Sequence, residues 1–251
     1  MVVIPTLGNR LNMLNMCLNS ITSSKYKVEI VIIFPKNKTF QMKQFTSARQ
    51  NVLLEPQNLN MIESVNYVLQ KYTEYKYFTW ISDDDLLSNS CIDRGVSFLE
   101  SNMNYVATFG AVDYIDVAGR KIGKWNPPKF AQILNGFVPS AIKLEGSVFN
   151  LEKVRSIGSI PPTIKYCPDV YLILKLSKRG KLKKITGPSV AQFRIHLDSP
   201  TTNSRYKSNL ESCFLQFKLG SNINRILILV FGPTVFILKN LAMKLIFRVK
   251  I

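Results

Sequence analysis

The chain has 251 residues, of which 46% are hydrophobic and 20% charged, so it is large enough to bury the core of one substantial domain. This composition excludes collagen, a disordered tail and a disulfide-stabilised miniprotein. The formal net charge is +17 and is unevenly spread: residues 1–100 hold ten Lys/Arg and nine Asp/Glu, whereas residues 101–251 hold twenty-three and seven. The basic excess therefore belongs to the C-terminal part.

The four cysteines lie far apart in the sequence and form no C-x-x-C pair, and the chain holds a single histidine. A conventional zinc site is therefore not predicted, and a reducing compartment is the simplest expectation. No charged leader with a cleavable apolar stretch precedes the first apolar run, so we expect a cytoplasmic protein.

Short β-prone runs alternate with segments of helical periodicity in the first half of the chain, which is typical of an α/β sheet with parallel strands. Apolar residues at helical spacing predict a helix over 11–21. Capping boxes predict two more helices, one from Asn60 with Glu63 and one from Ser90 with Asp93. Buried strands are predicted over residues 2–4, 28–34, 52–54 and 77–81.

The second half of the chain is less regular. Glycines and prolines mark an irregular region over residues 119–139. Further strands are predicted over 106–112, 182–185 and 190–194, and further helices over 151–157 and 169–178.

The last thirty residues differ in kind from the rest of the chain. The 13 positions 226–238 are nearly all apolar, and the charged residues around them are all Lys or Arg. Because a bilayer-spanning helix needs about 20 apolar residues, we expect an interfacial segment that is attracted to anionic lipid. The alternative is a packed C-terminal helix, including one that forms a dimer contact.

Three consecutive acids, Asp83, Asp84 and Asp85, follow the predicted strand 77–81. Ionised carboxylates beside an apolar strand repel one another and are costly, and a bound divalent cation would offset that cost. In an extended chain Asp83 and Asp85 project to one side and Asp84 to the other, so the first and third are predicted metal ligands. Oxygen ligands of this kind suit Mg²⁺ or Mn²⁺. The alternative is a solvated acidic turn that caps the next helix.

Two segments of the first half resemble the GT-A glycosyltransferases, specifically the family 2-like group. The sequence VIPTLGNR at residues 3–10 looks like the opening strand and loop of that group, and FTWISDDDLL at 78–87 looks like its D-x-D strand. The resemblance covers residues 1 to about 115 well and continues more weakly to about 205. It implies a Rossmann-like fold with a mostly parallel central sheet flanked by helices.

The weaker part of the resemblance suggests acceptor-side and catalytic positions. EGSVFN at 145–150 resembles a strand that carries acceptor-side residues, PDVYL at 168–172 resembles the helix start that carries the catalytic base, and FRIH at 193–196 resembles the closing segment. Two features depart from the family pattern. Phe34 is followed by Pro35-Lys36 rather than by a base-reading acid, and Pro168 replaces the acid that precedes the catalytic Asp.

The resemblance and the residue chemistry together predict the following site. A metal acting as a Lewis acid and template would stabilise the leaving diphosphate, and a carboxylate would deprotonate the acceptor hydroxyl, which implies inversion. Asp169 is the predicted base, with Asp113 and Glu145 as competitors and an ordinary helix cap as its alternative role. His196 is expected to complete the metal shell or to contact the diphosphate, unless it is simply a packed or surface residue. The predicted nucleotide-sugar contacts are Pro5, Thr6, Asn9, Arg10, Asp83, Asp84 and Arg194, and the predicted metal ligands are Asp83, Asp85 and His196.

A basic run over residues 178–184 suits RNA, anionic lipid or a diphosphate-linked acceptor. No stacking aromatics interleave with it and no RNA-binding signature surrounds it, so no nucleic-acid partner is expected.

We therefore predict a metal-dependent, inverting glycosyltransferase. It would move a sugar from a nucleotide-diphosphate sugar to a saccharide or lipid-linked acceptor in surface glycan synthesis, at the inner face of the cell membrane. Residues 1–115 would form the nucleotide-sugar half, 116–205 the acceptor half of the same domain, and 206–251 a helical, membrane-associated segment. A nucleotidyltransferase is disfavoured because the first strand lacks a glycine-rich phosphate loop. The remaining alternative is a catalytically silent relative that binds membrane or nucleic acid through its basic half. Donor base, linkage and oligomeric state are not predicted.

Overall fold

The computed structural model describes residues 1–230 except 24, 46–49, 139 and 197–203, together with residues 234 and 237. Its strands are β1 (Val2–Pro5), β2 (Ile30–Phe34), β3 (Gln50–Leu54), β4 (Tyr77–Trp80), β5 (Leu86–Leu87), β6 (Tyr105–Phe109), β7 (Val112–Ile115), β8 (Lys121–Trp125), β9 (Val148–Asn150), β10 (Lys181–Lys184) and β11 (Ala191–Arg194). Its helices are α1 (Leu11–Ser20), α2 (Thr39–Lys43), α3 (Met61–Lys71), α4 (Cys91–Ser101), α5 (Ala131–Leu134), α6 (Leu151–Ser156), α7 (Pro168–Leu176) and α9 (Arg205–Leu219).

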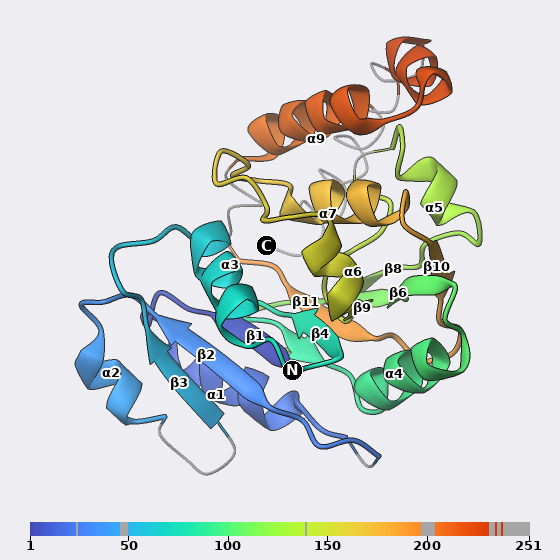
Figure 1. The fold of residues 1–251 in the computed structure, drawn as a ribbon. Coiled ribbons are helices and arrows are strands. Elements are labelled where there is room, and N and C mark those ends of the chain that lie inside the picture. The colour runs from blue at the N-terminus through green and yellow to red at the C-terminus, as the bar shows by residue number, and fades with distance from the viewer. Residues whose placement is uncertain are drawn as a thin grey trace.

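A seven-stranded sheet of order β10-β6-β9-β4-β1-β2-β3 forms the centre of the molecule (Figure 1). Among its described pairings, only those of β9 with β4 and with β6 are antiparallel. The register aligns Val3 of β1 with Val31 of β2 and with Trp80 of β4. This confirms the predicted α/β architecture with a mostly parallel sheet.

Each face of the central sheet has its own hydrophobic core, because successive side chains of a strand point to opposite faces. On one face Val3 packs with residues of α3, α6 and α7. On the other face Val2 and Ile4 pack with residues of α1 and α4. Burial on both faces explains why β1 and β2 are continuous apolar runs.

A smaller sheet of order β5-β11-β7-β8 lies beside the central sheet. The single strand predicted over 106–112 is therefore wrong. The chain forms β6 in the central sheet and then begins β7 in the smaller sheet. The break falls at Gly110, where a Cβ atom would lie 2.5 Å from Cγ1 of Val190, so the chain passes Val190 too closely for a side chain. The region 119–139, expected to be irregular, contains β8 and the short helix α5.

Of the two predicted capping boxes, one is confirmed and one is wrong. The side chain of Asn60 accepts hydrogen bonds from the backbone N–H groups of Ile62 and Glu63, and Glu63 accepts one from the backbone of Asn60. Ser90 precedes α4 in a left-handed conformation with φ of 63° and makes no capping hydrogen bond. The carboxylate of Asp93 instead accepts a hydrogen bond from the hydroxyl of Ser23, in a loop distant in the sequence.

The chain beyond the second sheet is helical where it is described. Helix α9 lies at the top of the molecule, next to α7 (Figure 1), and residues 222–230 are also helical. Among the described residues no helix is long and apolar enough to cross a bilayer. The end of the predicted interfacial segment 226–238 lies outside the described residues, apart from positions 234 and 237.

Candidate active site

The three acids form a turn rather than a strand end. β4 ends at Trp80, and Asp83 and Asp84 occupy a turn in which the backbone N–H of Asp85 donates to the carbonyl of Ser82 at 3.3 Å. The expectation that Asp84 would point away from its neighbours is therefore wrong. Side chains alternate only along an extended chain, and this chain turns immediately before the acids.

Asp83 and Asp84 share one cation, the guanidinium of Arg10. Nη2 of Arg10 lies 2.6 Å from Oδ1 of Asp83, and Nη1 lies 2.6 Å from Oδ2 of Asp84. The hydroxyl of Thr6 donates to the other oxygen of Asp83 at 2.5 Å and accepts a hydrogen bond from the backbone of Gly8 at 3.0 Å. The loop after β1 and the turn after β4 thus meet because parallel strands end at the same edge of a sheet.

Burial shapes the electrostatics of this pair. Burial of Asp83 raises its pKa above the usual 3.8, while the hydrogen bond from Thr6 and the charge of Arg10 act in the opposite direction. Asp83 is 2% exposed, so its ionised form depends on these two partners. The turn is therefore an anionic patch that a cation stabilises.

Two further predicted residues, Pro5 and Asn9, lie between the end of β1 and the start of α1. The exposed side chain of Asn9 accepts a hydrogen bond from Nζ of Lys38 at 2.8 Å, and Pro5 is the last residue of β1. A pocket of about 440 Å³ opens here and is lined by Asn9, Arg10, Leu11, Asn12 and Met13. Arg10 therefore lies between this pocket and the acidic turn.

His196 comes from the other end of the chain to the same turn. Its Nε2 lies 2.7 Å from Oδ2 of Asp84 and 3.0 Å from Nη1 of Arg10, and its side chain is 6% exposed. The structure therefore brings together the predicted residues Arg10, Asp83, Asp84 and His196. A carboxylate oxygen and an imidazole nitrogen are both ligands that Mn²⁺ accepts.

Asp85 and Arg194 lie elsewhere than predicted. Asp85 is 1% exposed, and its Oδ1 accepts the backbone N–H of Arg194 at 2.8 Å. The guanidinium of Arg194, also 1% exposed, donates to the carbonyls of Asp84, Asp116 and Val117. Burial raises the pKa of Asp85 well above its usual value. Asp85 and Arg194 thus anchor the turn from within the protein, and the buried Arg194 is not positioned to bind a diphosphate. The carboxylate beside His196 is that of Asp84 rather than that of Asp85.

Asp169 is the second residue of α7, after Pro168, and it is half-buried. The position that caps the helix belongs to Cys167, so Asp169 is not the N-cap that the alternative role required. A lysine that the sequence analysis did not single out, Lys143, lies close enough to Asp169 for the two charges to interact. Burial alone would lower the pKa of this ammonium group, but nearby ionisable groups, Tyr114 first and then Glu145 and Asp169, outweigh it and the pKa is raised.

The two competitors for the base role have different surroundings. Oε2 of Glu145 is buried with no hydrogen-bond partner among the described residues, and burial raises the pKa of this carboxyl. Asp113, on β7, is held by Nζ of Lys121 at 2.8 Å and by the hydroxyl of Ser189 at 2.9 Å. Asp113 therefore stabilises the smaller sheet.

The loop before Asp169 is fastened to α9 by Glu211. The two oxygens of this carboxylate accept the backbone N–H groups of Lys165, Tyr166 and Cys167 at 2.9, 2.6 and 2.7 Å. No local pattern in the sequence marks Glu211, and its only signal is that it is the single acid after Asp198.

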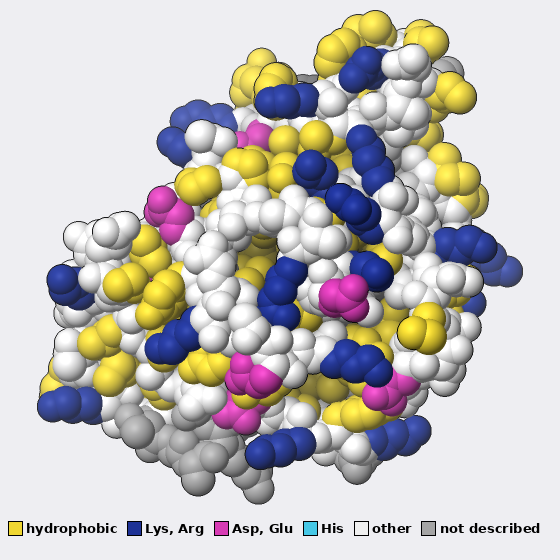
Figure 2. All heavy atoms as spheres, viewed as in Figure 1, with side chains coloured by type: hydrophobic (Ala, Val, Ile, Leu, Met, Phe, Trp, Pro, Cys, Tyr) yellow, Lys and Arg dark blue, Asp and Glu magenta, His cyan; other side chains and the backbone are white. Residues whose placement is uncertain are grey.

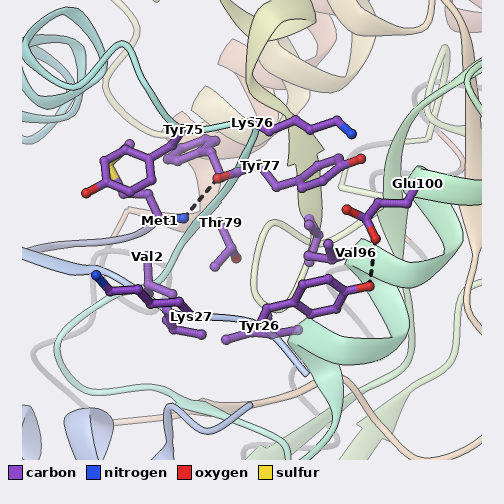
Figure 3. Close-up of a pocket in the computed structure, with 14 residues that line it drawn as sticks. Met1, Val2, Tyr26, Lys27, Tyr75, Lys76, Tyr77, Thr79, Val96 and Glu100 are labelled. Carbon is purple, nitrogen blue, oxygen red and sulfur yellow. Dashed lines mark hydrogen bonds between the residues drawn. The ribbon is translucent and has the colours of Figure 1, made fainter. Parts of the chain in front are cut away.

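A separate cavity of about 180 Å³ lies at the opposite edge of the sheet (Figure 3). Thr79 points into it, Tyr26 donates to Glu100 at 2.9 Å along one side, and the amino group of Met1 donates to the carbonyl of Tyr77 at 2.9 Å along the other. It is built from the amino ends of β1 and β4, whereas the acidic turn follows their carboxyl ends. It therefore does not form part of the acidic site.

No protein-family model matches the sequence, and no curated protein matches it. Solved structures do match. TarS of S. aureus has a TM-score of 0.61 at 13% identity, over 88% of this chain and 40% of TarS. TarS 1–349 in complex with UDP-GlcNAc gives 0.63 at 11% identity, over 88% and 67%. GalNAc-T7 with UDP, GalNAc and Mn²⁺ gives 0.59 at 13% identity, over 78% and 44%.

These neighbours are GT-A glycosyltransferases, so the chain has the GT-A fold that the sequence predicted. The chain spans 40% of the TarS chain and 44% of the GalNAc-T7 chain.

Proposed function

We propose that this protein is a glycosyltransferase that uses a nucleotide-diphosphate sugar. The observation that carries the proposal is the convergence of Arg10, Asp83, Asp84 and His196 where β1, β4 and β11 end. In open α/β sheets, ligands bind beyond the carboxyl ends of the strands. The GT-A fold adds support because structural neighbours were solved with UDP, UDP-GlcNAc or Mn²⁺.

The donor set beside Arg10 suits Mn²⁺ or Mg²⁺. Asp84 and His196 would hold the ion, with Asp83 next to them, in place of the predicted set of Asp83, Asp85 and His196. No group of three or more metal-binding side chains converges anywhere in the described part of the chain. Two protein ligands are what such ions use when substrate phosphates complete the shell. The ion would supply Lewis-acid stabilisation of the leaving diphosphate.

Arg10 would bind the donor phosphates through the same two nitrogens that now contact Asp83 and Asp84. A guanidinium matches phosphate oxygens in a bidentate geometry and keeps its charge at any physiological pH. Thr6 holds the carboxylate of Asp83 in place, and Asn9 faces the adjoining pocket. Uridine is the first base to test, because the neighbours were solved with UDP and UDP-GlcNAc.

Asp169 would be the general base. A single carboxylate that removes the proton of the acceptor hydroxyl supports one direct displacement, which inverts the anomeric centre. Lys143 would favour the ionised, proton-accepting form of Asp169 through its charge. The acceptor would be a saccharide or lipid-linked glycan, and the reaction would take place at the cytoplasmic face of the membrane, in surface glycan synthesis.

Thermal unfolding of the purified chain with UDP, GDP, CDP and dTDP, each with and without Mn²⁺, tests the proposal. We expect one nucleotide to raise the melting temperature in a Mn²⁺-dependent manner, because a ligand that binds only the native state stabilises it. Asp84→Asn should abolish the Mn²⁺-dependent part, and Asp113→Asn should keep it. If no nucleotide stabilises the protein while vesicles or RNA bind it, the catalytically silent alternative replaces this proposal.

A further inference from the structure

Helix α9 exposes four large apolar residues and buries three polar ones, although Leu215 packs into the core. Tyr206, Leu210, Phe214 and Phe217 are 63%, 50%, 61% and 45% exposed, and their spacing of four, four and three residues places them on one side of the helix. We call these four residues the outer face. A helix that packs on a core normally points its apolar side inward, so this arrangement needs an explanation.

The opposite side of α9 carries Asn209, Ser212 and Gln216, none of them more than 2% exposed. Nε2 of Gln216 donates to the carbonyl of Asn135 at 2.9 Å, and Glu211 is hydrogen-bonded to the loop before α7. These polar contacts fix the rotation of the helix about its axis. The outer face therefore cannot turn inward without breaking them.

The apolar surface continues beyond α9. In the helical residues 222–230, the exposed side chains include Ile223, Ile226, Leu229 and Val230. Figure 2 shows hydrophobic side chains gathered at the top of the molecule, where Figure 1 places α9, with Lys and Arg side chains among them. Contiguous exposed apolar surface of this kind marks an interaction site.

The charges on this surface are all positive. Nζ of Lys218 lies 5.7 Å from the ring centre of Phe214, and the guanidinium of Arg225 lies 5.7 Å from that of Phe217. Glu211 is the only acid after Asp198, and its hydrogen bonds hold it against the loop before α7. Aromatic rings flanked by Lys and Arg suit the boundary between acyl chains and anionic headgroups.

We infer that the outer face docks on the surface of an anionic lipid bilayer. A second copy of the chain fits this surface less well, because a symmetric contact would bring Lys218 and Arg225 of both copies together. The inference goes beyond the proposed transferase activity and does not require it. It locates the membrane contact of the predicted segment 206–251 on the outer face of α9, and α9 contacts the loop before Asp169 through Glu211.

Flotation of the full chain with phosphatidylcholine vesicles, with and without phosphatidylglycerol, tests the inference in the absence of nucleotide and metal. We expect binding to the anionic vesicles. Phe214→Ser/Phe217→Ser should weaken it by roughly tenfold or more, because two phenyl rings no longer leave water. Phe40→Ser/Met103→Ser, which removes two exposed apolar side chains elsewhere, should bind like the natural chain.

The charge contribution has its own variant pair. Lys218→Gln/Arg225→Gln should reduce binding to the anionic vesicles, and Lys71→Gln/Lys76→Gln, two lysines that also lie over tyrosine rings, should not. Melting temperatures of all variants establish that they fold. The inference is overturned if the natural chain ignores anionic vesicles, if the Phe214/Phe217 variant binds them unchanged, or if the outer face proves to be a dimer contact by sedimentation. Nucleotide-dependent stabilisation of the same variants reports separately on the proposed function.

Discussion

The carboxylate of Asp84 and the imidazole of His196 lie 2.7 Å apart, although 112 residues separate them in the sequence. The end of strand β11 makes this contact possible. Arg194, the last residue of β11, binds the carbonyl of Asp84 and, through its backbone, the carboxylate of Asp85. Arg194, which anchors the turn, lies two positions before His196, which faces the turn. The position of His196 is therefore fixed relative to Asp84.

Replacing His196 tests whether it binds metal or phosphate. If it is a metal ligand, His196→Ala should weaken the apparent affinity for Mn²⁺, measured by UDP-dependent thermal stabilisation, by roughly tenfold or more. Stabilisation by UDP alone should stay unchanged. An equal loss with and without Mn²⁺ would instead assign His196 to the diphosphate.

Replacing Asp169 tests the general base. Asp169→Asn keeps the size of the side chain and removes its basicity, so turnover should fall by roughly 10²- to 10⁴-fold while nucleotide affinity is kept. Asp113→Asn is the matched control, because Asp113 is held by Lys121 and Ser189 in the smaller sheet. Near-normal turnover of Asp169→Asn with an intact fold would transfer the role to Glu145.

Features with a local cause could be predicted from the sequence. The apolar run of β2 reports burial on both faces of the sheet, and Asn60 with Glu63 forms a cap within four residues. Ser90 and Asp93 show the same local pattern, yet Asp93 is bound by a loop some seventy residues earlier, and that contact leaves no trace in the pattern. The central sheet was therefore predictable, whereas the split of β6 from β7, which depends on Val190, was not.

The candidate site divides in the same way. The strand before the three acids predicts where they lie in the fold. The prediction that their side chains alternate in direction was wrong, because the chain turns at Asp83. Only the family resemblance brought His196 to the site, since nothing in either segment encodes a contact across 112 residues. Arg194 was expected to contact the nucleotide sugar, but it is buried against the carbonyls of three other residues.

The pH dependence of stability should change when Glu145 is replaced. Burial raises the pKa of Glu145 above the usual 4.5, so the folded state holds this proton more tightly than the unfolded state. Its contribution to stability is therefore complete below about pH 4.5 and is lost as the pH rises through the folded-state pKa. Glu145→Gln removes this loss, so the free energy of unfolding of the variant minus that of the natural chain should increase from about pH 4.5 to neutrality. Urea unfolding at several pH values measures it, and a flat difference would contradict the raised pKa.

Replacing Glu211 tests whether α9 supports the loop that precedes Asp169, the proposed base. Glu211→Gln exchanges one acceptor oxygen for an amide that repels a backbone N–H, so the free energy of unfolding should fall by about 1–3 kcal/mol. Because Lys165, Tyr166 and Cys167 directly precede Pro168 and Asp169, kcat should fall as well, with the KM for the donor unchanged. Glu152→Gln on α6, whose side chain is 83% exposed, is the matched control and should alter neither quantity. A loss of stability with an unchanged kcat would limit Glu211 to holding α9 in place.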